Sequence, residues 1–365
     1  MTHTTELQPR RARLWAALRA ERVDAFLVLA LPNIRYLAGF TGSNAVLLVT
    51  EDRALLFTDP RYQTQAPLES DCEIRVAKGP LLGQAVAWVK RLRATRLGFE
   101  RNRISFDQHQ VLLKERTAKG RPSIHLKPIG GAVERLRMVK SEAEIATIRT
   151  AAGLNSEAFE QALAHFKTGT TEIDLAAEIE YRMRRLGADG PSFDTIVASG
   201  PRAALPHAHP TDAAVSRDEL LLIDMGATVA GYASDMTRTL AVGEVRPKAR
   251  RMYHAVSESQ LAAIEAVKPG VTCNTVDRAA RRVLARYGFE KLFIHSTGHG
   301  LGLEIHEGPR LGRREPTKLE AGMVITIEPG VYLEGFGGVR IEDTVAVTPN
   351  GCEILTPTGK ELRIL

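Results

Sequence analysis

Residues 1–131 alternate between strand-like and helix-like patterns of apolar positions. A continuous apolar run at residues 25–32 is typical of a buried strand. The runs 44–50 and 53–58 read as two adjacent strands joined by two acidic residues. Between the first run and this pair, residues 31–44 carry turn-forming residues, and apolar positions after Pro9 recur at helical spacing. The pattern predicts an α/β domain with no recognisable chemistry of its own.

A second domain is expected after residues 128–131, where proline and glycine interrupt the pattern. Ser141 followed by Glu144 has the spacing of a capping box, which marks the start of a helix. Apolar residues recur at helical spacing from Ile145 onward, so a long helix is expected there. At roughly 150 residues per domain, a chain of 365 residues accommodates two domains. We expect them to occupy residues 1–131 and 132–365.

The second domain shows signs of an internal duplication. The windows 169–187 and 270–288 each begin and end with glycine and have threonine two positions after the first glycine. Each window encloses an amphipathic pattern that is typical of a helix ending at the second glycine. Two apolar runs around a glycine-containing turn follow each window. This predicts a pseudo-symmetric pair of hairpins that form one curved antiparallel sheet with helices outside it.

Carboxylates stand in or beside these apolar runs. Asp224 and Asp235 lie 11 residues apart, and Glu328 and Glu342 lie 14 apart. On paired antiparallel strands either interval can bring two side chains to one face. Charges at core-facing strand positions are strongly disfavoured unless something compensates them. Two divalent cations would offset the four negative charges, and His299, which is flanked by glycines, adds an imidazole ligand. The sequence therefore predicts a dinuclear metal hydrolase.

The ligand types indicate both the metal and the reaction. Oxygen ligands with one imidazole and no sulfur favour Mn²⁺, with Co²⁺, Fe²⁺ and Zn²⁺ as alternatives. Two such ions ~3.5–4 Å apart can hold a bridging water and generate hydroxide near neutral pH. Glu328 is the candidate acceptor of the water's proton, and His207 and His306 are candidates for stabilising the carbonyl or protonating the leaving nitrogen. Four residues two positions from a candidate ligand share its strand face and are expected to support it: Thr237, Thr326, Arg340 and Thr344.

Each of these residues has a plainer explanation when it is taken alone. Any single Asp or Glu could lie on a half-exposed strand, and His306 could be structural. His207 lies in the turn-like segment ALPHAHP, where exposure explains it equally well, and His209 is expected at the surface. The joint pattern favours a metal site, because two matched hairpins each carry two carboxylates and a histidine stands between glycines.

Composition narrows the class of protein. The net charge is +6, with basic clusters at residues 10–13, 248–251 and 278–282, but no aromatic residues interleave them. Solvated helix faces are therefore a better interpretation than nucleic-acid binding. Three widely separated cysteines indicate neither a disulfide framework nor a thiolate zinc site, which fits a reducing compartment. The longest apolar run falls far short of the ~20 residues that span a bilayer. We expect a cytoplasmic protein that binds neither nucleic acid nor membrane.

Five segments together resemble the pita-bread metallopeptidases, specifically their proline-directed branch of Xaa-Pro aminopeptidases and Xaa-Pro dipeptidases (prolidases). The segments are VASGPRAALPHAHP, LLIDMGATVAGYASDMTRT, HSTGHGLGLEIHEGPR, VITIEPGVY and GGVRIEDT. A sixth segment, NIRYLAGFTGSN, is similar to the creatinase-like domain that precedes the catalytic domain in this branch. The resemblance covers nearly the whole chain. It implies an α/β fold, in which a creatinase-like N-terminal domain precedes a pseudo-symmetric pita-bread catalytic domain.

The resemblance implies a role for each candidate residue. The implied metal ligands are Asp224, Asp235, His299, Glu328 and Glu342. Asp235 and Glu342 would bridge the two ions or bind them most closely. His207 and His306 would face the substrate, while Arg340 and Arg310 would bind substrate or orient ligands. No ligand position departs from the family's pattern, which argues against a creatinase-like enzyme or a histone-chaperone-like pseudoenzyme. The N-terminal domain argues against a methionine aminopeptidase.

The reaction that the resemblance implies is hydrolysis of the bond between an N-terminal residue and a following proline, in proline-containing peptides. A strict Xaa-Pro dipeptidase is the alternative, in which Arg310 or Arg340 would pair with the proline carboxylate. A non-catalytic binding protein on the same fold is a remote alternative. The resemblance also implies a homodimer. The sequence fixes neither the metal, nor the preferred first residue, nor the physiological peptides.

Overall fold

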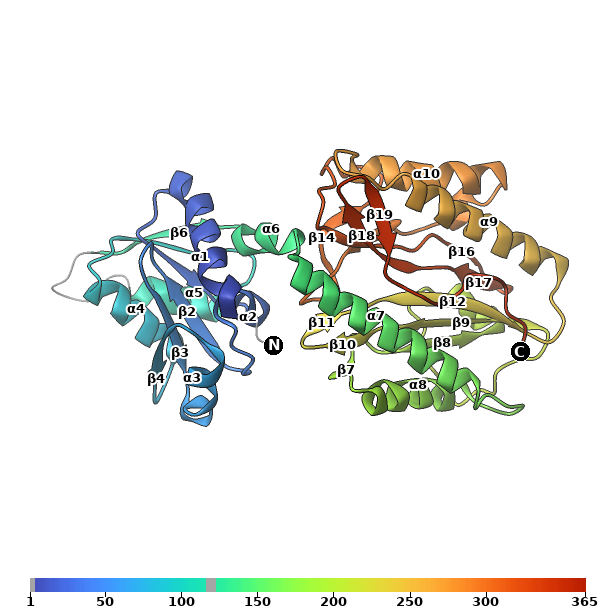
Figure 1. Ribbon diagram of the computed structural model, residues 1–365, viewed down its shortest axis with the longest axis horizontal. Coiled ribbons are helices and arrows are strands. Elements are labelled where there is room, and N and C mark those ends of the chain that lie inside the picture. Colours follow the sequence, from blue (N-terminus) through green and yellow to red (C-terminus); the bar gives the residue numbers. More distant parts are fainter. Residues whose placement is uncertain (1–3, 116–122) are drawn as a thin grey trace. The chain divides into compact units, whose positions relative to one another are not determined.

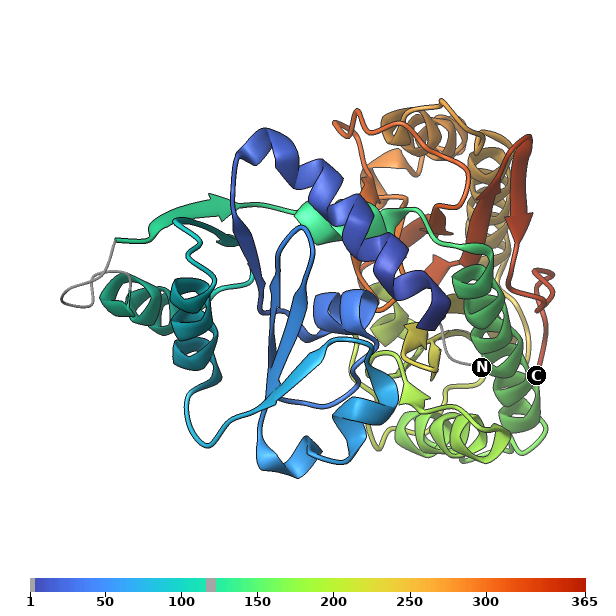
Figure 2. The same ribbon diagram turned by 60° about the vertical axis from the view of Figure 1, so that its left-hand side comes forward.

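The computed structural model describes residues 4–115 and 123–365 (Figure 1, Figure 2). The chain divides into two compact units, Met1–Arg137 and Met138–Leu365. Each unit has a hydrophobic core of its own. Within the described ranges, no helix combines the length and the apolar character needed to cross a membrane.

The first unit is built around a mixed sheet in the order β4-β3-β2-β1-β5-β6. Its strands are β1 (Ala25–Val28), β2 (Ala45–Val49), β3 (Ala54–Thr58), β4 (Glu73–Val76), β5 (Arg96–Glu100) and β6 (His125–Ile129). Its helices are α1 (Thr4–Leu18), α2 (Leu31–Ala38), α3 (Gln65–Glu69), α4 (Leu81–Arg91), α5 (Phe106–Glu115) and α6 (Ala132–Met138). The central strand β1 pairs antiparallel with β2 and parallel with β5, so helical crossovers are required and the α/β prediction is confirmed.

Both faces of this sheet are buried. Ala25 and Leu27 on β1 pack into the core formed with α4 and α5, while Phe26 points to the opposite face, where α1 and α2 lie (Figure 1, Figure 2). A strand covered on both faces reads as a continuous apolar run, as the sequence showed for this segment. The two adjacent strands predicted downstream are also confirmed, since β2 and β3 pair antiparallel with Leu47 opposite Leu56.

Helix α2 forms where the sequence predicted only turns. The carboxylate of Glu100, at the end of β5, accepts hydrogen bonds from the backbone N–H groups of Leu29 and Ala30 at 2.7 and 2.9 Å. It also accepts one from Asn33 Nδ2 at 2.5 Å. A carboxylate at a helix N-terminus satisfies unpaired N–H groups and is favoured by the helix dipole. The residue that stabilises the start of α2 thus comes from a distant strand.

The second unit places antiparallel strands between two pairs of helices, α7 (Glu142–Leu163) with α8 (Glu172–Leu186), and α9 (Pro247–Glu265) with α10 (Cys273–Arg286) (Figure 1). The strands of its first half are β7 (Gly190–Pro191), β8 (Ile196–Ser199), β9 (Glu219–Met225), β10 (Ala227–Val229), β11 (Tyr232–Ala233) and β12 (Met236–Val242). Those of its second half are β13 (Gly298–Gly300), β14 (Glu307–Leu311), β15 (Val324–Ile327), β16 (Gly330–Leu333), β17 (Gly337–Arg340), β18 (Asp343–Thr348) and β19 (Gly351–Ile354). The predicted capping box of Ser141 and Glu144 begins α7.

The two halves of this unit follow the same plan. In the first half β9 pairs with β12, and the short strands β10 and β11 occupy the connection between them. In the second half β15 pairs with β18, and the hairpin β16–β17 occupies the connection. Helices α8 and α10 fill the two glycine-bounded windows, with Thr171 and Thr272 as their N-cap residues. Gly187 and Gly288 have φ of +104° and +79° where these helices end. The predicted duplication is therefore present at the level of elements.

The two halves are joined along strand positions next to the acidic residues. The backbone N–H of Glu342 donates to the carbonyl of Thr237 at 3.1 Å. One residue pair further on, Thr239 Oγ1 accepts from the N–H of Arg340 and donates to its carbonyl, at 3.1 and 2.9 Å. Each half also packs on its own helices, α7 and α8 for the first and α9 and α10 for the second. This arrangement brings carboxylates from distant segments to one junction.

Candidate active site

The first half of the second unit contributes two carboxylates from neighbouring strands. Asp224 on β9 lies opposite Thr237 on β12, and Asp235 immediately precedes β12. Gly226 makes this approach feasible, because a Cβ at that position would lie only 2.1 Å from the carbonyl oxygen of Ser234. A larger residue there would push the two strands apart at the point where both carboxylates are presented.

The second half repeats the arrangement with two glutamates. Ile327 at the end of β15 lies opposite Asp343 at the start of β18. The same antiparallel register continued by one residue places Glu328 opposite Glu342. Both glutamates therefore stand where a hairpin opens, rather than within its hydrogen-bonded ladder.

His299 reaches the carboxylates because glycines flank it. A Cβ at Gly298 would lie 1.9 Å from the carbonyl oxygen of Thr326, and one at Gly300 would lie 2.0 Å from that of Gly308. Only glycine therefore lets β13 lie this close to the neighbouring backbone segments on both sides. The backbone N–H of His299 also donates to Thr326 Oγ1 at 3.1 Å. The glycines noted in the sequence thus place the imidazole.

One cavity of about 570 Å³ in the second unit collects the side chains that the sequence singled out. It is lined by Asp224, Asp235, His299, Glu328, Glu342, His207, His306, Arg310 and Arg340. Asp235, Glu342 and Arg340 are buried, whereas His207, His306 and Arg310 are exposed. His209, expected at the surface, is exposed and also borders the cavity. Buried acids therefore lie beside histidines that an incoming peptide can contact.

The imidazole of His299 faces the acidic residues through Nε2. Its Nδ1 lies 3.0 Å from the carbonyl oxygen of Gly300, a contact that favours the tautomer with its hydrogen on Nδ1. Nε2 is 3.6 Å from Asp235 Oδ2 and 3.6 Å from Glu328 Oε1. One ligand atom from each of Asp235, His299 and Glu342 lies within 4.8 Å of the others. These three side chains could therefore surround a single metal ion.

Arg340 is a buried cation that organises one side of this cluster. Its Nη2 donates to Asp224 Oδ2, its Nη1 to the hydroxyl of Tyr332 at 2.7 Å, and its Nε to Thr237 Oγ1 at 3.0 Å. The Nε2 atom of His295, which also borders the cavity, lies 2.8 Å from the same Tyr332 hydroxyl. Burial lowers the pKa of His295 to about 4, so its ring is neutral. Sequence reasoning missed Tyr332 and His295, although both stand in the quoted segments VITIEPGVY and HSTGHGLGLEIHEGPR.

Hydroxyl groups fix other members of the cluster. Thr237 Oγ1 donates to Glu342 Oε2 at 2.7 Å, so the hydroxyl that accepts a hydrogen bond from Arg340 also orients this carboxylate. Thr344 Oγ1 donates to the backbone carbonyl of Asp235 at 2.8 Å. These contacts cross between the two halves of the unit, and they hold the carboxylates in defined orientations.

The loop that carries His207 is fastened by Glu172, a residue of α8 that is 1% exposed. Its carboxylate accepts hydrogen bonds from the backbone N–H of Ser199 at 2.9 Å and from Arg202 Nε at 3.0 Å. It also accepts from the N–H and the hydroxyl of Thr211, at 3.0 and 2.8 Å. Both ends of the loop are therefore held by one buried side chain, which sequence reasoning did not identify.

Burial shifts the pKa values of the cluster away from their ordinary range. Burial, followed by the charges of Asp224 and Glu328, raises the pKa of Asp235. Burial and then the charge of Asp235 raise the pKa of Glu342. Burial raises the pKa of Glu328 to about 8 and lowers that of His299 to about 4. Unaided, the carboxylates therefore resist full ionisation at neutral pH, while the imidazole stays in the neutral form that binds metals.

These side chains fit divalent cations. The Oδ1 atom of Asp224 is buried and has no hydrogen-bond partner among the residues that the structure describes. A buried carboxylate oxygen without a partner is costly, and a bound cation removes that cost. The donor set consists of carboxylate oxygens and one imidazole nitrogen, without thiolate, which suits Mn²⁺ and similar ions.

Metal-free protein is expected to lose stability as the pH rises from about 6.5 to about 8, above the range in which the lowered pKa values of His295 and His299 act in the opposite direction. An unfolded carboxyl titrates near pH ~4, whereas burial raises the pKa of Glu328 to about 8 and those of Asp235 and Glu342 likewise. The folded state therefore binds more protons across this interval, and the free energy of unfolding falls as they are released. Divalent metal should remove this loss, because it binds the ionised carboxylates. Thermal unfolding of chelated and metal-loaded protein at pH 5, 6.5 and 8 measures how much the metal stabilises the fold at each pH. A stabilisation by metal that does not grow with pH would contradict the expectation.

Comparison with known families identifies the chain. The model of metallopeptidase family M24 matches residues 146–349, and that of the creatinase/prolidase N-terminal domain matches residues 10–139. The chain belongs to metallopeptidase family M24. The resemblance drawn from its motifs is confirmed, and membership of this family implies a divalent metal cofactor.

This M24 metallopeptidase is similar to known proteins along nearly its whole length. An Xaa-Pro dipeptidase from Pyrococcus horikoshii is 38% identical over 341 residues, which cover 93% of this chain and 94% of that protein. The solved structure of an Xaa-Pro dipeptidase from Bacillus anthracis has a TM-score of 0.93 at 39% identity, covering 98% of this chain and 100% of that one. An X-Pro aminopeptidase from Thermotoga maritima has a TM-score of 0.88 at 38% identity, covering 96% and 100%. These likenesses confirm the predicted fold, a creatinase-like domain followed by a pita-bread catalytic domain.

Proposed function

We propose that this enzyme is a dinuclear metallo-exopeptidase that hydrolyses the bond between an N-terminal residue and a following proline. The main support is the cavity in which four carboxylates and His299 meet beside exposed histidines, in a chain of family M24. Relatives of similar length include Xaa-Pro dipeptidases and an X-Pro aminopeptidase. Because an Xaa-Pro bond has no N–H, its recognition depends on the carbonyl, the α-amino group and the proline ring.

We propose that the cofactor is a pair of divalent ions, Mn²⁺ most naturally, with Co²⁺, Zn²⁺ and Fe²⁺ as alternatives. The side chains that would hold it are Asp224, Asp235, His299, Glu328 and Glu342. When bound, such ions polarise a scissile carbonyl and lower the pKa of a water molecule. The orphaned Oδ1 of Asp224 and the 4.8 Å grouping of Asp235, His299 and Glu342 support this assignment.

The protein's own groups would move the protons. Glu328 borders the cavity, and the hydrogen bond that its carboxylate accepts from a described residue, Thr326 Oγ1, is long at 3.4 Å, so this carboxylate would be available to take a proton from the attacking water. The same carboxyl would then deliver that proton to the proline nitrogen as it leaves. His207 and His306 are exposed in the cavity and are proposed to donate hydrogen bonds to the substrate carbonyl as negative charge develops on it.

The two candidate arginines differ in what they can bind. Arg340 is buried and uses its Nε, Nη1 and Nη2 atoms within the protein, so we assign it to the orientation of Asp224. Arg310 is exposed at the cavity and forms no ion pair with the residues that the structure describes. A free cation in this position suits the carboxylate of an Xaa-Pro dipeptide. This observation favours a strict dipeptidase as the second candidate function.

Chelation and rescue across peptide lengths tests the proposal. EDTA is expected to abolish hydrolysis of Ala-Pro and Ala-Pro-Ala, and Mn²⁺ or Co²⁺ should restore it, because the carboxylates need cations to act together. The initial rates of the restored enzyme on the two peptides decide between the candidates. A dipeptidase should cleave Ala-Pro far faster, whereas an aminopeptidase should accept the longer peptide. Full activity in protein shown by elemental analysis to be metal-free would refute both.

Further assignments rest on the family and on composition. We propose that residues 132–365 form the catalytic domain and residues 1–131 a creatinase-like accessory domain, as the matched segments support. We also propose a cytoplasmic homodimer that acts on proline-containing peptides. Cys72, Cys273 and Cys352 are all free thiols, which suits a reducing compartment. A monomeric mass by light scattering would contradict the dimer.

A further inference from the structure

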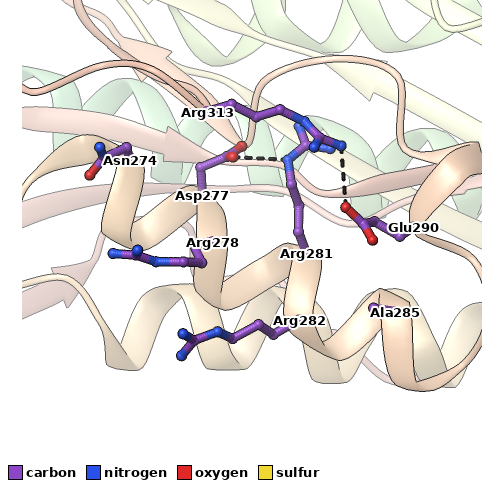
Figure 3. A pocket seen from close by; sticks show the side chains of 8 residues that line it. All are labelled: Asn274, Asp277, Arg278, Arg281, Arg282, Ala285, Glu290 and Arg313. Atoms are coloured by element: carbon purple, nitrogen blue, oxygen red, sulfur yellow. Dashed lines mark hydrogen bonds and ion pairs between the residues drawn. The ribbon is translucent and has the colours of Figure 1, made fainter.

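The basic cluster at residues 278–282, which the peptidase activity does not use, lines a second cavity. The cavity has a volume of about 310 Å³ and lies against α10 (Figure 3). Its charged lining consists of Arg278, Arg281, Arg282, Arg313, Asp277 and Glu290. None of these residues borders the candidate active site. The cavity is therefore a separate feature of the second unit.

Asp277 and Arg281 form a fixed inner wall. The Arg281 side chain is buried, and its Nε donates to Asp277 Oδ2 at 2.8 Å. Its Nη1 and Nη2 donate to the backbone carbonyls of Phe293 and His295, at 3.0 and 2.5 Å. Asp277 Oδ1 accepts from Thr297 Oγ1 at 2.9 Å. The charges of the pair cancel, and these hydrogen bonds give the wall a defined shape in the absence of any ligand.

The other cations of the cavity are poorly compensated. Arg278 and Arg282 are exposed, lie one helical turn apart and extend to the same side of α10 (Figure 3). Among the residues that the structure describes, neither has an acidic partner, and Arg278 contacts only the hydroxyl of Thr275 at 3.1 Å. Arg313 and Glu290 are 3.3 Å apart, but their side chains are 60% and 41% exposed, so water weakens this ion pair. Four guanidinium groups against two carboxylates leave the lining with a charge of +2.

We propose that this cavity binds a small phosphate-type oxyanion, either free inorganic phosphate or the phosphate group of a small monoester. Guanidinium groups bind tetrahedral oxyanions with paired, charge-assisted hydrogen bonds. A dianion would match the charge of the lining, and it would relieve the repulsion between the like charges of Arg278 and Arg282. The charges surround a cavity without aromatic side chains, which suits a small anion better than a nucleic-acid strand that needs a basic track or a stacking surface.

The proposal is tested by calorimetric titration of metal-loaded enzyme, desalted to remove excess metal, with inorganic phosphate at constant ionic strength. The informative variant is Arg278→Ala/Arg282→Ala. Its matched control is Arg185→Ala/Arg250→Ala, which removes two exposed helical arginines elsewhere in the second unit and changes the net charge equally. We expect saturable binding of one anion per chain, at least about 10-fold weaker in the first variant and unchanged in the control. If the double variant folds poorly, Arg282→Gln alone takes its place, and this single change should weaken phosphate binding several-fold.

A parallel titration with glycerol 3-phosphate separates the two sources of the anion. Tighter binding of the monoester identifies a metabolite site, and tighter binding of inorganic phosphate identifies a site for the free ion. Absence of saturable binding overturns the proposal, as does equal weakening in both double variants. Phosphate binding that persists in Arg278→Ala/Arg282→Ala places the anion outside this cavity and also overturns the proposal. A third titration uses a single-stranded oligonucleotide. Binding of this oligonucleotide by a protein that does not bind phosphate would also overturn the proposal. Because no peptide is hydrolysed in this experiment, its result does not depend on the proposed peptidase activity.

Discussion

Replacing Glu342 with glutamine is expected to reduce hydrolysis of an Xaa-Pro peptide on the order of 10³-fold, about 4 kcal/mol of transition-state stabilisation. Glu342 is 2% exposed, lies in the 4.8 Å group with Asp235 and His299, and is oriented by Thr237. The amide keeps the size of the side chain but removes the negative charge that the proposed role of Glu342 as a metal ligand requires. Bound metal should therefore fall together with kcat/KM, and elemental analysis beside steady-state kinetics measures both.

The matched control for this variant is Glu353→Gln. Glu353 lies on β19, which pairs with the strand that begins just after Glu342, but its carboxylate is 47% exposed and, among the described residues, pairs only with the exposed guanidinium of Arg149. The same chemical change there should leave metal content and kcat/KM unaltered. Glu342→Gln protein that keeps its full complement of metal would contradict the ligand assignment, even if its activity were low.

Replacing Arg340 with alanine is expected to destabilise the protein by about 3–5 kcal/mol, because it leaves a buried ion pair without its cation. The guanidinium is 3% exposed and bonds Asp224, Tyr332 and Thr237 at once. Loss of these contacts should also let Asp224 leave the orientation proposed for metal binding, and we expect kcat/KM to fall roughly 10–100-fold. Denaturant unfolding and steady-state kinetics of the metal-loaded variant measure the two effects.

Two further variants separate charge from geometry. Arg340→Lys keeps the positive charge but cannot make the three directed contacts, so it should recover part of the stability and little of the activity. Arg149→Ala removes one side of the exposed pair with Glu353 and should cost less than ~1 kcal/mol. Equal losses of stability in Arg340→Ala and Arg149→Ala would show that the buried contacts of Arg340 stabilise the protein no more than an exposed ion pair does.

Local sequence signals were sufficient to predict the helices and strands whose defining residues lie within the element itself. The run that became β1 is apolar at every position because helices cover both faces of its sheet. The start of α7 is encoded in its own first turn, where Ser141 and Glu144 bond each other's backbone N–H groups. Helix α8 likewise begins with its own capping box, formed by Thr171 and Asp174, and both glycine-bounded helices end beside their own glycine. These elements could be predicted because the residues that define them are neighbours in the sequence.

Elements defined by distant residues could not be predicted in the same way. Helix α2 was missed because the carboxylate that binds the backbone N–H groups just before its first residue belongs to the distant Glu100. The short pairs β10–β11 and β16–β17 lie inside connections that read simply as glycine-containing turns. Glu172 looks like any acidic residue in the first turn of a helix, and only the fold brings Ser199 and Thr211 to it.

The sequence by itself singled out the acidic side chains of the candidate site. Charged residues in apolar strands are costly, so Asp224, Glu328 and Glu342 stood out before any fold was known. The glycines around His299 likewise indicated tight backbone turns. The tertiary structure alone decided how these groups work together. It placed Arg340 against Asp224, tied Glu342 to the other half of the unit, and left one carboxylate oxygen unpaired. Such contacts depend on strand register and helix packing across more than a hundred residues, which no local pattern encodes.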